Sequence, residues 1–204
     1  MSYPDVYILR HGETEWNLVQ RIQGSQDSPL TEKGKEQARV QAGLLEPILR
    51  EHAGIPVYAS PLGRARETAR IAMGGCAPGL RLDLRLQEIN AGAWEGLTRH
   101  EVAAGWPIEW ALCGDDYELF TRAPNGETVQ AAFDRAEAFL KDLLCPAVVI
   151  THGIFSCFLR GILMGKTVGE ITDMPRQQGV IYHLSQGREE VIEKKCDEIE
   201  FSSK

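Results

Sequence analysis

The sequence predicts an α/β fold: a three-layer sandwich with a mostly parallel central sheet of about six strands and helices on both faces. Short apolar runs, among them residues 6–9 (VYIL) and 147–150 (AVVI), alternate with longer stretches of helical period. The 204 residues are 43% hydrophobic, which is enough for a substantial core. Because no Ser/Gly-rich or Pro-rich tract divides the chain, we expect one domain over residues 1–204.

Apolar runs and turn signals place the elements in order along the chain. Strands are expected near residues 5–10, 55–59, 82–87, 147–151, 179–185 and 189–195. Helices are expected over residues 31–46, 61–74, 127–144 and 154–164, with short helices near 98–104, 107–113 and 168–173. Thr31 suits the N-cap of the first helix, which should kink or restart at Pro47 because proline has no N–H to donate. Ser60 suits the N-cap of the second helix, with Pro61 in its first position.

Polar side chains follow several of the predicted strands. His11, with Arg10 before it, follows the first apolar run, and His152 follows the run at 147–150. Arg64 falls in the first turn of the helix that follows the second strand. Because parallel strands present ligands at their carboxyl ends, we expect these residues to converge at one edge of the sheet. The arginines indicate that the ligand is anionic.

This set of residues suits phosphoryl transfer to a histidine. A neutral imidazole attacks phosphorus, guanidinium groups hold the phosphate oxygens, and a carboxylic acid protonates the leaving oxygen. Arg10 and Arg64 are candidates for holding the phosphate, and His152 for a further hydrogen bond to it. Glu88 is the candidate acid because it ends another predicted strand. Two other glutamates remain open for the acid role: Glu95 and Glu127.

Five segments resemble the signatures of the histidine phosphatase superfamily, in its phosphoglycerate-mutase-like branch. In chain order they cover residues 10–14 (RHGET), 30–38 (LTEKGKEQA), 60–69 (SPLGRARETA), 88–96 (EINAGAWEG) and 151–153 (THG). The resemblance spans nearly the whole chain, from residue 5 to residue 185. Five motifs in the family order are far more specific than an RHG triplet alone.

The resemblance implies a role for each matching residue. His11 becomes phosphorylated, Arg10, Arg64 and His152 form the phosphate pocket with it, and Glu88 acts as general acid and then as base for water. The candidate substrate contacts are Asn17, Gln23, Gly153 and Glu127. Glu127 stays open between such a contact and a helix-start residue that complements the helix dipole. The family uses no metal and no organic cofactor for this chemistry.

The segment after Glu88 favours hydrolysis. Mutases of this family carry a longer, basic insertion there that grips phosphoglycerate, whereas residues 97–126, an expected lid, are short and acidic in this chain. We therefore expect a metal-independent phosphatase of small phosphomonoesters. The alternatives are a cofactor-dependent phosphoglycerate mutase and a non-catalytic protein that binds phosphoanions. A metal site at His11 and His152 is disfavoured because two arginines would lie beside the cation.

Composition excludes several partners. With 29 acidic and 22 basic residues the net charge is −7, which repels nucleic acid and anionic lipid. The chain shows no signal peptide and no apolar run that could cross a membrane. Its five cysteines are scattered and never spaced as CxxC, as in reduced cytoplasmic proteins. We expect a cytoplasmic protein whose partner is a small phosphorylated substrate, and a homodimer stays open.

Overall fold

The computed structural model describes residues 3–75 and 79–194. Its strands are β1 (Val6–Arg10), β2 (Val57–Ala59), β3 (Leu80–Leu82), β4 (Ala147–Thr151), β5 (Ile181–Ser185) and β6 (Arg188–Ile192). Its helices are α1 (Glu15–Leu18), α2 (Glu32–Glu51), α3 (Gly63–Ala72), α4 (Arg99–Gly105), α5 (Pro107–Ala111), α6 (Asp116–Thr121), α7 (Val129–Lys141) and α8 (Gly153–Leu163). Turns of 3₁₀ helix lie at Leu84–Leu86, Gly92–Trp94 and Val168–Glu170.

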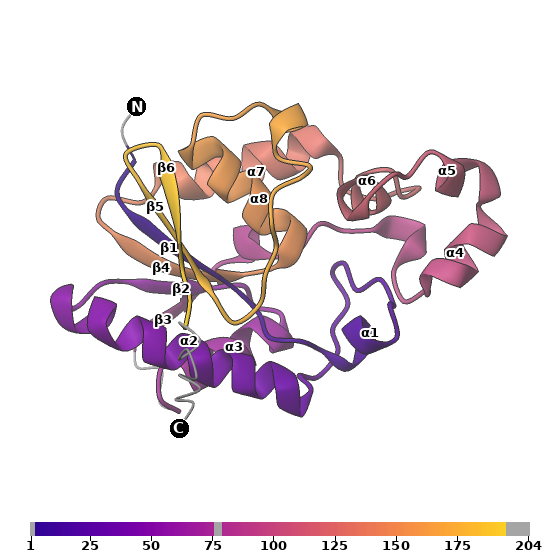
Figure 1. Ribbon diagram of the computed structural model, residues 1–204. Helices are drawn as coiled ribbons and strands as arrows, with labels where there is room; N and C mark the ends of the chain where they lie inside the picture. The colour runs from indigo at the N-terminus through magenta and orange to yellow at the C-terminus, as the bar shows by residue number, and fades with distance from the viewer. Residues whose placement is uncertain (1–2, 76–78, 195–204) are drawn as a thin grey trace, which may run out of the picture.

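The strands form a six-stranded sheet in the order β3-β2-β4-β1-β5-β6. The pairs from β3 to β1 are parallel, whereas β5 and β6 run antiparallel to their neighbours. Helices α2 and α3 cover one face and α7 and α8 cover the other (Figure 1). The predicted three-layer α/β fold with a mostly parallel sheet is therefore confirmed.

Side chains of the central strands alternate between two hydrophobic cores. In β1, Val6 and Ile8 pack with residues of α7 and α8, whereas Tyr7 and Leu9 pack with residues of α2 and α3. This period of two is what a strand with helices on both faces requires. All of β4 is buried as well, so the two strands that carry the histidines lie at the centre of the molecule.

The register of the sheet brings the ends of three strands together. Arg10 pairs with Thr151, so β1 and β4 end at the same level. His11 and His152 follow these residues and leave the sheet side by side, and Ser60 follows β2 at the same edge. The loops after the strands therefore build a shared site, as expected for parallel strands.

Helix α2 continues through Pro47, which corrects the prediction that a helix over 31–46 ends there. Pro47 is exposed, and so is Gly43, whose carbonyl would have accepted the missing bond. Water can satisfy a carbonyl on the solvent side, so the loss is small. Leu45 and Ile48 on the opposite face keep the helix packed on the sheet.

Helix α3 begins later than predicted and is capped by a distant residue. Its N-cap is Leu62, with no side-chain hydrogen bond of its own. Instead Asp27 accepts hydrogen bonds from the backbone N–H groups of Gly63 and Arg64. Ser60, the predicted N-cap, contacts His152. The Asp27 carboxylate therefore satisfies free N–H groups at the N-terminus of α3, in the same turn from which the Arg64 side chain extends.

Of the segment predicted as a strand over 82–87, only Leu82 lies in a strand. Strand β3 ends at Leu82, and a 3₁₀ turn follows at Leu84–Leu86, with Asp83 as its N-cap. Glu88 therefore follows a turn and not a strand, which corrects the prediction. The short helices α1 and α6 were not predicted, and α6 contains the buried side chains of Tyr117 and Leu119.

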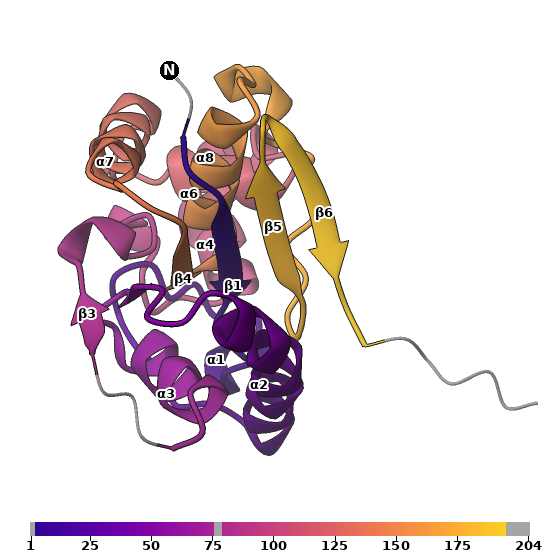
Figure 2. The same ribbon diagram turned by 90° about the vertical axis from the view of Figure 1, so that its left-hand side faces the viewer.

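The α4–α6 segment projects beyond the sheet and has a core of its own (Figure 1). That core contains Ile22, Ala91, Trp94, Val102, Leu119 and Ala123. Backbone hydrogen bonds between Ile22 and both Gly96 and Leu97 join it to the loop after β1. Figure 2 shows α4 and α6 behind the ends of β1 and β4. The segment is therefore placed over the edge of the sheet that carries the histidines.

No helix in residues 3–75 and 79–194 is both long enough and apolar enough to cross a bilayer. Cys113, Cys145 and Cys157 are free thiols. Cys76, Cys196 and the last residue of the strand predicted over 189–195 lie outside the described residues.

Close contact between the loop after β1 and the start of α2 generates a stability prediction. A Cβ atom at Gly34 would lie 2.0 Å from the backbone oxygen of Glu13, whereas one at Gly43 of the same helix meets nothing within 4 Å. We expect Gly34→Ala to lower the free energy of unfolding by about 3 kcal/mol through overpacking. Gly43→Ala should raise it by about 0.5–1 kcal/mol. Urea unfolding of both variants measures the difference, and equal stabilities would contradict the close contact.

Candidate active site

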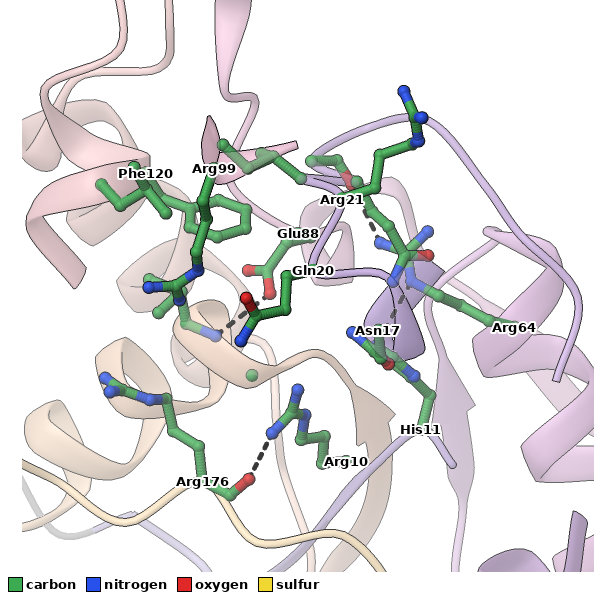
Figure 3. Close-up of a pocket in the computed structure, with 16 residues that line it drawn as sticks. Arg10, His11, Asn17, Gln20, Arg21, Arg64, Glu88, Arg99, Phe120 and Arg176 are labelled. Atoms are coloured by element: carbon green, nitrogen blue, oxygen red, sulfur yellow. Dashed lines mark hydrogen bonds between the residues drawn. The ribbon is translucent and has the colours of Figure 1, made fainter. Parts of the chain in front are cut away.

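A pocket of about 220 Å³ lies at the carboxyl edge of the sheet (Figure 3). Loops after β1 and β3, the start of α8 and the α4–α6 segment all contribute to it. Its lining consists of Arg10, His11, Asn17, Gln20, Arg21, Ile22, Gln23, Gly24, Arg64, Glu88, Arg99, Leu119, Phe120, Gly153, Ile154 and Arg176. Five arginines and a single carboxylate among these residues make the pocket strongly positive.

His11 is buried and neutral in this pocket. Its Nδ1 lies 2.7 Å from the carbonyl oxygen of Gly12, and because a carbonyl only accepts, Nδ1 carries the proton. Nε2 therefore holds the lone pair, and it accepts a hydrogen bond from Nε of Arg64 at 3.3 Å. Burial and the charges of Arg64 and Arg10 hold the pKa of His11 well below its usual value. The imidazole thus has an unprotonated Nε2, as a nucleophile requires.

Arg64 is held rigidly beside His11. Its guanidinium donates to the carbonyl oxygens of Gly24 at 2.9 Å and Gln26 at 2.5 Å, and it pairs with Asp27 at 3.1 Å. These acceptors come from the loop between α1 and α2, so one loop both caps helix α3 and orients its arginine. A buried guanidinium fixed in this way offers preorganised donors to an anion.

Arg10 approaches the pocket from the end of β1. Its guanidinium donates to the backbone carbonyl of Arg176. It also lies against Gly153, where an added Cβ would be 3.2 Å from the guanidinium carbon. Gly153 lines the pocket and leaves room for Arg10 to reach it, which gives this predicted site residue a steric reason.

His152 lies directly behind His11. It is fully buried, its ring centroid is 5.1 Å from that of His11, and its Nε2 is 2.7 Å from the hydroxyl of Ser60. Burial and the charge of Arg64 lower its pKa well below the usual value, so this imidazole is neutral as well. Its Nδ1 has no hydrogen-bond partner within the described residues.

Glu88 is oriented by backbone donors. Its carboxylate accepts hydrogen bonds from the N–H groups of Ile89 at 3.0 Å, Ile154 at 3.1 Å and Phe155 at 2.9 Å. The last two belong to the first turn of α8, whose N–H groups have no partner within the helix. Among the pocket-lining residues of the described chain, Glu88 is the carboxylate.

The two rival glutamates lie outside the pocket lining. Glu95 accepts from the backbone N–H groups of Ser25 at 2.6 Å and Ala91 at 3.0 Å. Glu127 forms a two-pronged ion pair with Arg135, at 2.9 and 2.7 Å. It precedes the N-cap of α7 and so is not part of that helix. Glu127 lies outside the pocket lining and directly before the N-cap of α7, so the substrate contact and the helix-start role considered for it both stay predictions.

Arg135 braces the segment that carries Glu88. Its guanidinium donates to the carbonyl oxygens of Arg85 at 2.7 Å and Gln87 at 2.8 Å. It also lies 4.0 Å from the ring centroid of Phe155, one of the residues whose N–H binds Glu88. Arg135 was not predicted as a site residue, because nothing in a helical stretch indicates which arginine turns inward.

Asn17 and Gln23 both line the pocket and both contact Thr14. Oδ1 of Asn17 accepts from the backbone N–H and hydroxyl of Thr14, each at 3.1 Å, in a capping box at the start of α1. Nε2 of Gln23 donates to the Thr14 hydroxyl at 2.7 Å, and its Oε1 has no partner within the described residues. The two amides therefore shape the loop after His11 as well as the pocket.

Three arginines of the pocket were also missed: Arg21, Arg99 and Arg176. The acidic residues in the expected lid, residues 97–126, had indicated that this segment provides no basic side chains to bind a substrate. Those acidic groups serve the segment itself, because Asp115 caps α6 and Glu118 pairs with Arg122. The net formal charge of residues 97–126 therefore does not indicate which charged side chains of this segment face the pocket.

Residues 3–75 and 79–194 contain no cluster of three or more His, Cys, Asp or Glu side chains placed to hold a metal ion. The positive charge of the pocket comes from the guanidinium groups that line it.

Known proteins share both sequence and fold with this chain. Residues 6–197 match the model of the histidine phosphatase superfamily (branch 1). A relative from Enterobacter sp. (strain 638), named "Probable phosphoglycerate mutase GpmB", is 38% identical over 169 residues, which are 78% of this chain and 74% of that protein. The structure of Bacillus stearothermophilus YhfR superposes with a TM-score of 0.76 at 31% identity, covering 92% of this chain and 95% of its own. A mycobacterial glucosyl-3-phosphoglycerate phosphatase, Rv2419c, superposes with a TM-score of 0.72 at 26% identity, covering 94% and 100%.

The two buried imidazoles generate a pH prediction. Their pKa values are lowered in the folded state, so the unfolded chain binds protons first as the pH falls through the ordinary histidine value near 6.5. Stability is then lost toward low pH, by up to about 1.4 kcal/mol per pH unit for each histidine. We expect His11→Asn to reduce this slope between about pH 7 and pH 5. Replacing the exposed His100 by Gln is the control. If the free energy of unfolding falls equally steeply with pH in the wild type, His11→Asn and His100→Gln, the conclusion that His11 and His152 are buried in the neutral form is contradicted.

Proposed function

The chain belongs to the histidine phosphatase superfamily, and we propose that it is a metal-independent phosphatase of small phosphomonoesters. The observation that carries this proposal is the neutral His11, whose unprotonated Nε2 lies beside the Arg64 guanidinium in a positive pocket. Such an imidazole is a competent nucleophile toward a phosphate monoester held by arginines.

In the first step, Nε2 of His11 attacks phosphorus. The N–P bond forms while the ester P–O bond breaks, and Glu88 gives its proton to the departing alkoxide, so a neutral alcohol leaves. Arg10 and Arg64 hold the non-bridging oxygens and stabilise the charge that develops on them.

In the second step, water takes the place of the alcohol. Glu88, now a carboxylate, accepts a proton from the water as its oxygen attacks phosphorus. The N–P bond breaks, the electron pair returns to Nε2 of His11, and inorganic phosphate leaves. The three backbone donors that orient Glu88 keep it in position for both proton transfers.

Other residues support these steps without exchanging protons with the substrate. His152 supplies a hydrogen bond at the phosphate, and Asn17 and Gln23 contact it from the loop after His11. Glu127 acts at a distance, because its ion pair with Arg135 braces the segment before Glu88. We propose that the α4–α6 segment serves as the lid over the leaving group.

Phosphoglycerate mutase activity is the second candidate, because a relative that is 38% identical bears that name. A mutase must retain its phosphohistidine until the phosphoryl group returns to the substrate, whereas a phosphatase loses it to water. Interconversion of 2- and 3-phosphoglycerate that exceeds the release of free phosphate would favour the mutase.

The first test measures hydrolysis without divalent metal. We expect the protein to hydrolyse a chromogenic phosphomonoester in EDTA, and His11→Ala to abolish turnover because no nucleophile remains. Acid quenching of the wild-type reaction should trap a phosphoprotein that is acid-labile and base-stable. Turnover no greater than that of His11→Ala would refute the proposal. Phosphate binding by calorimetry without any turnover would identify a binding protein instead.

The second test separates the acid from the nucleophile. We expect Glu88→Gln to lower kcat for an alkyl phosphate about 10²- to 10⁴-fold, because a poor leaving group needs the proton. The loss for p-nitrophenyl phosphate should be much smaller, since that leaving group departs without protonation. Equal decreases in kcat for both esters would assign the role of general acid to another residue. Asp27→Asn, which neutralises another carboxylate near Arg64, is the matched control.

A further inference from the structure

Arg160 of α8 is a fully buried arginine that does not line the pocket. All three nitrogens of its guanidinium donate hydrogen bonds. Nε and Nη2 donate to the carboxylate of Glu189 on β6 at 2.6 and 2.7 Å, and Nη1 donates to the backbone carbonyl of Pro175 at 2.6 Å. The guanidinium also lies 3.7 Å from the ring centroid of Tyr182 on β5. This planar group therefore fixes the Pro175 carbonyl relative to α8, β5 and β6.

The Pro175 carbonyl begins a short segment, residues 175–178, which we call the anchor segment. The carbonyl of its next residue, Arg176, accepts a hydrogen bond from the guanidinium of Arg10 (Figure 3). Two consecutive carbonyls of the anchor segment thus connect Arg160 with Arg10, because one accepts from each arginine. The position of the acceptor for Arg10 depends on the position of the carbonyl that Arg160 holds.

Further hydrogen bonds connect the anchor segment to β5 and to the loop after β1. The N–H of Gln177 donates to the hydroxyl of Tyr182 at 2.7 Å, and Nε2 of Gln178 donates to the carbonyl of His11 at 3.1 Å. Residues 175–178 belong to no helix or strand. Their conformation is therefore set by these individual contacts and not by a repeating backbone pattern.

The ion pair between Arg160 and Glu189 contributes geometry more than stability. Its two side chains are 0% and 14% exposed, so both lose most of their hydration on folding. This desolvation offsets much of their attraction, and replacing such a pair with apolar side chains is often neutral for stability. A guanidinium with partners on all three nitrogens nevertheless fixes directions that an apolar side chain does not fix. We therefore expect the pair to matter for the position of the anchor segment.

We propose that Arg160, held by Glu189, is a positioning residue that places Arg10 for phosphate binding through the anchor segment. Arg160 itself does not touch the substrate. When the carbonyl that orients Arg10 shifts, the guanidinium shifts with it, and a misplacement of about 1 Å costs up to about a hundredfold in rate. This inference rests on the proposed function, in which Arg10 holds the phosphate, and binding of inorganic phosphate measures it separately from turnover.

The experiment uses the double variant Arg160→Met/Glu189→Leu, which removes the pair without leaving an unpaired buried charge. We expect the Kd for inorganic phosphate, measured by calorimetry, to rise about tenfold, and kcat/KM for p-nitrophenyl phosphate to fall about ten- to a hundredfold. Urea unfolding verifies that the variant is folded. Glu189→Gln, which keeps the size of the side chain and removes one acceptor oxygen, is the milder second variant and should change both quantities in the same direction. Glu190→Gln, at an exposed position of the same strand, should leave both unchanged.

Measurements in an Arg10→Gln background separate positioning from a general loss of structure. If Arg160 acts through Arg10, removing the ion pair in that background should lower kcat/KM no more than about twofold further, because coupled residues are not additive. A full further decrease would overturn the proposal, and so would an unchanged phosphate Kd in the folded double variant.

The phosphatase and the positioning role can fail independently. Absence of turnover by the wild-type protein would refute the phosphatase, whereas the Kd for inorganic phosphate would still report whether the ion pair positions Arg10. Turnover by the wild type with equal kcat/KM and equal phosphate Kd in the double variant would overturn the positioning role and leave the phosphatase intact.

Discussion

Parallel pairing between β1 and β4 is the interaction on which the rest of the site depends. The pairing of Arg10 with Thr151 decides that His11 and His152 leave the sheet together. A slip of one residue would send the side chains of either strand to the opposite face and reverse both cores. Catalytic geometry and hydrophobic packing are therefore fixed by the same register, and neither can change alone.

The side chains of the catalytic pocket are oriented more by hydrogen bonds to the backbone than by ion pairs with carboxylates. Arg64 binds two carbonyl oxygens, Arg10 binds a third, and Glu88 is occupied by three N–H groups of the main chain. Backbone partners orient these side chains without cancelling the charge of the arginines. The guanidinium groups consequently remain effective toward an anion, and burial together with their charge lowers the pKa of both histidines.

Much of the fold and the centre of the site could be predicted from the sequence because they depend on local patterns. Apolar runs followed by polar residues mark strand ends, and these placed His11 and His152 correctly at one edge. Features that depend on distant partners were missed. Asp27 caps a helix far along the chain, and Arg176 faces the pocket from a loop without any periodicity. The acid Glu88 follows a turn instead of a strand because Asp83 ends the strand early by capping a 3₁₀ turn.

The separate core of the α4–α6 segment has an evolutionary consequence. Val102 of α4 and Trp94 of the turn before it belong to this core, which contains no residue of the central sheet. Sequence drift in this cluster can reshape the wall around the leaving group while the strands and their histidines stay unchanged. The strands that carry the histidines and the wall of the pocket thus belong to separate packing units, which can change independently in related chains.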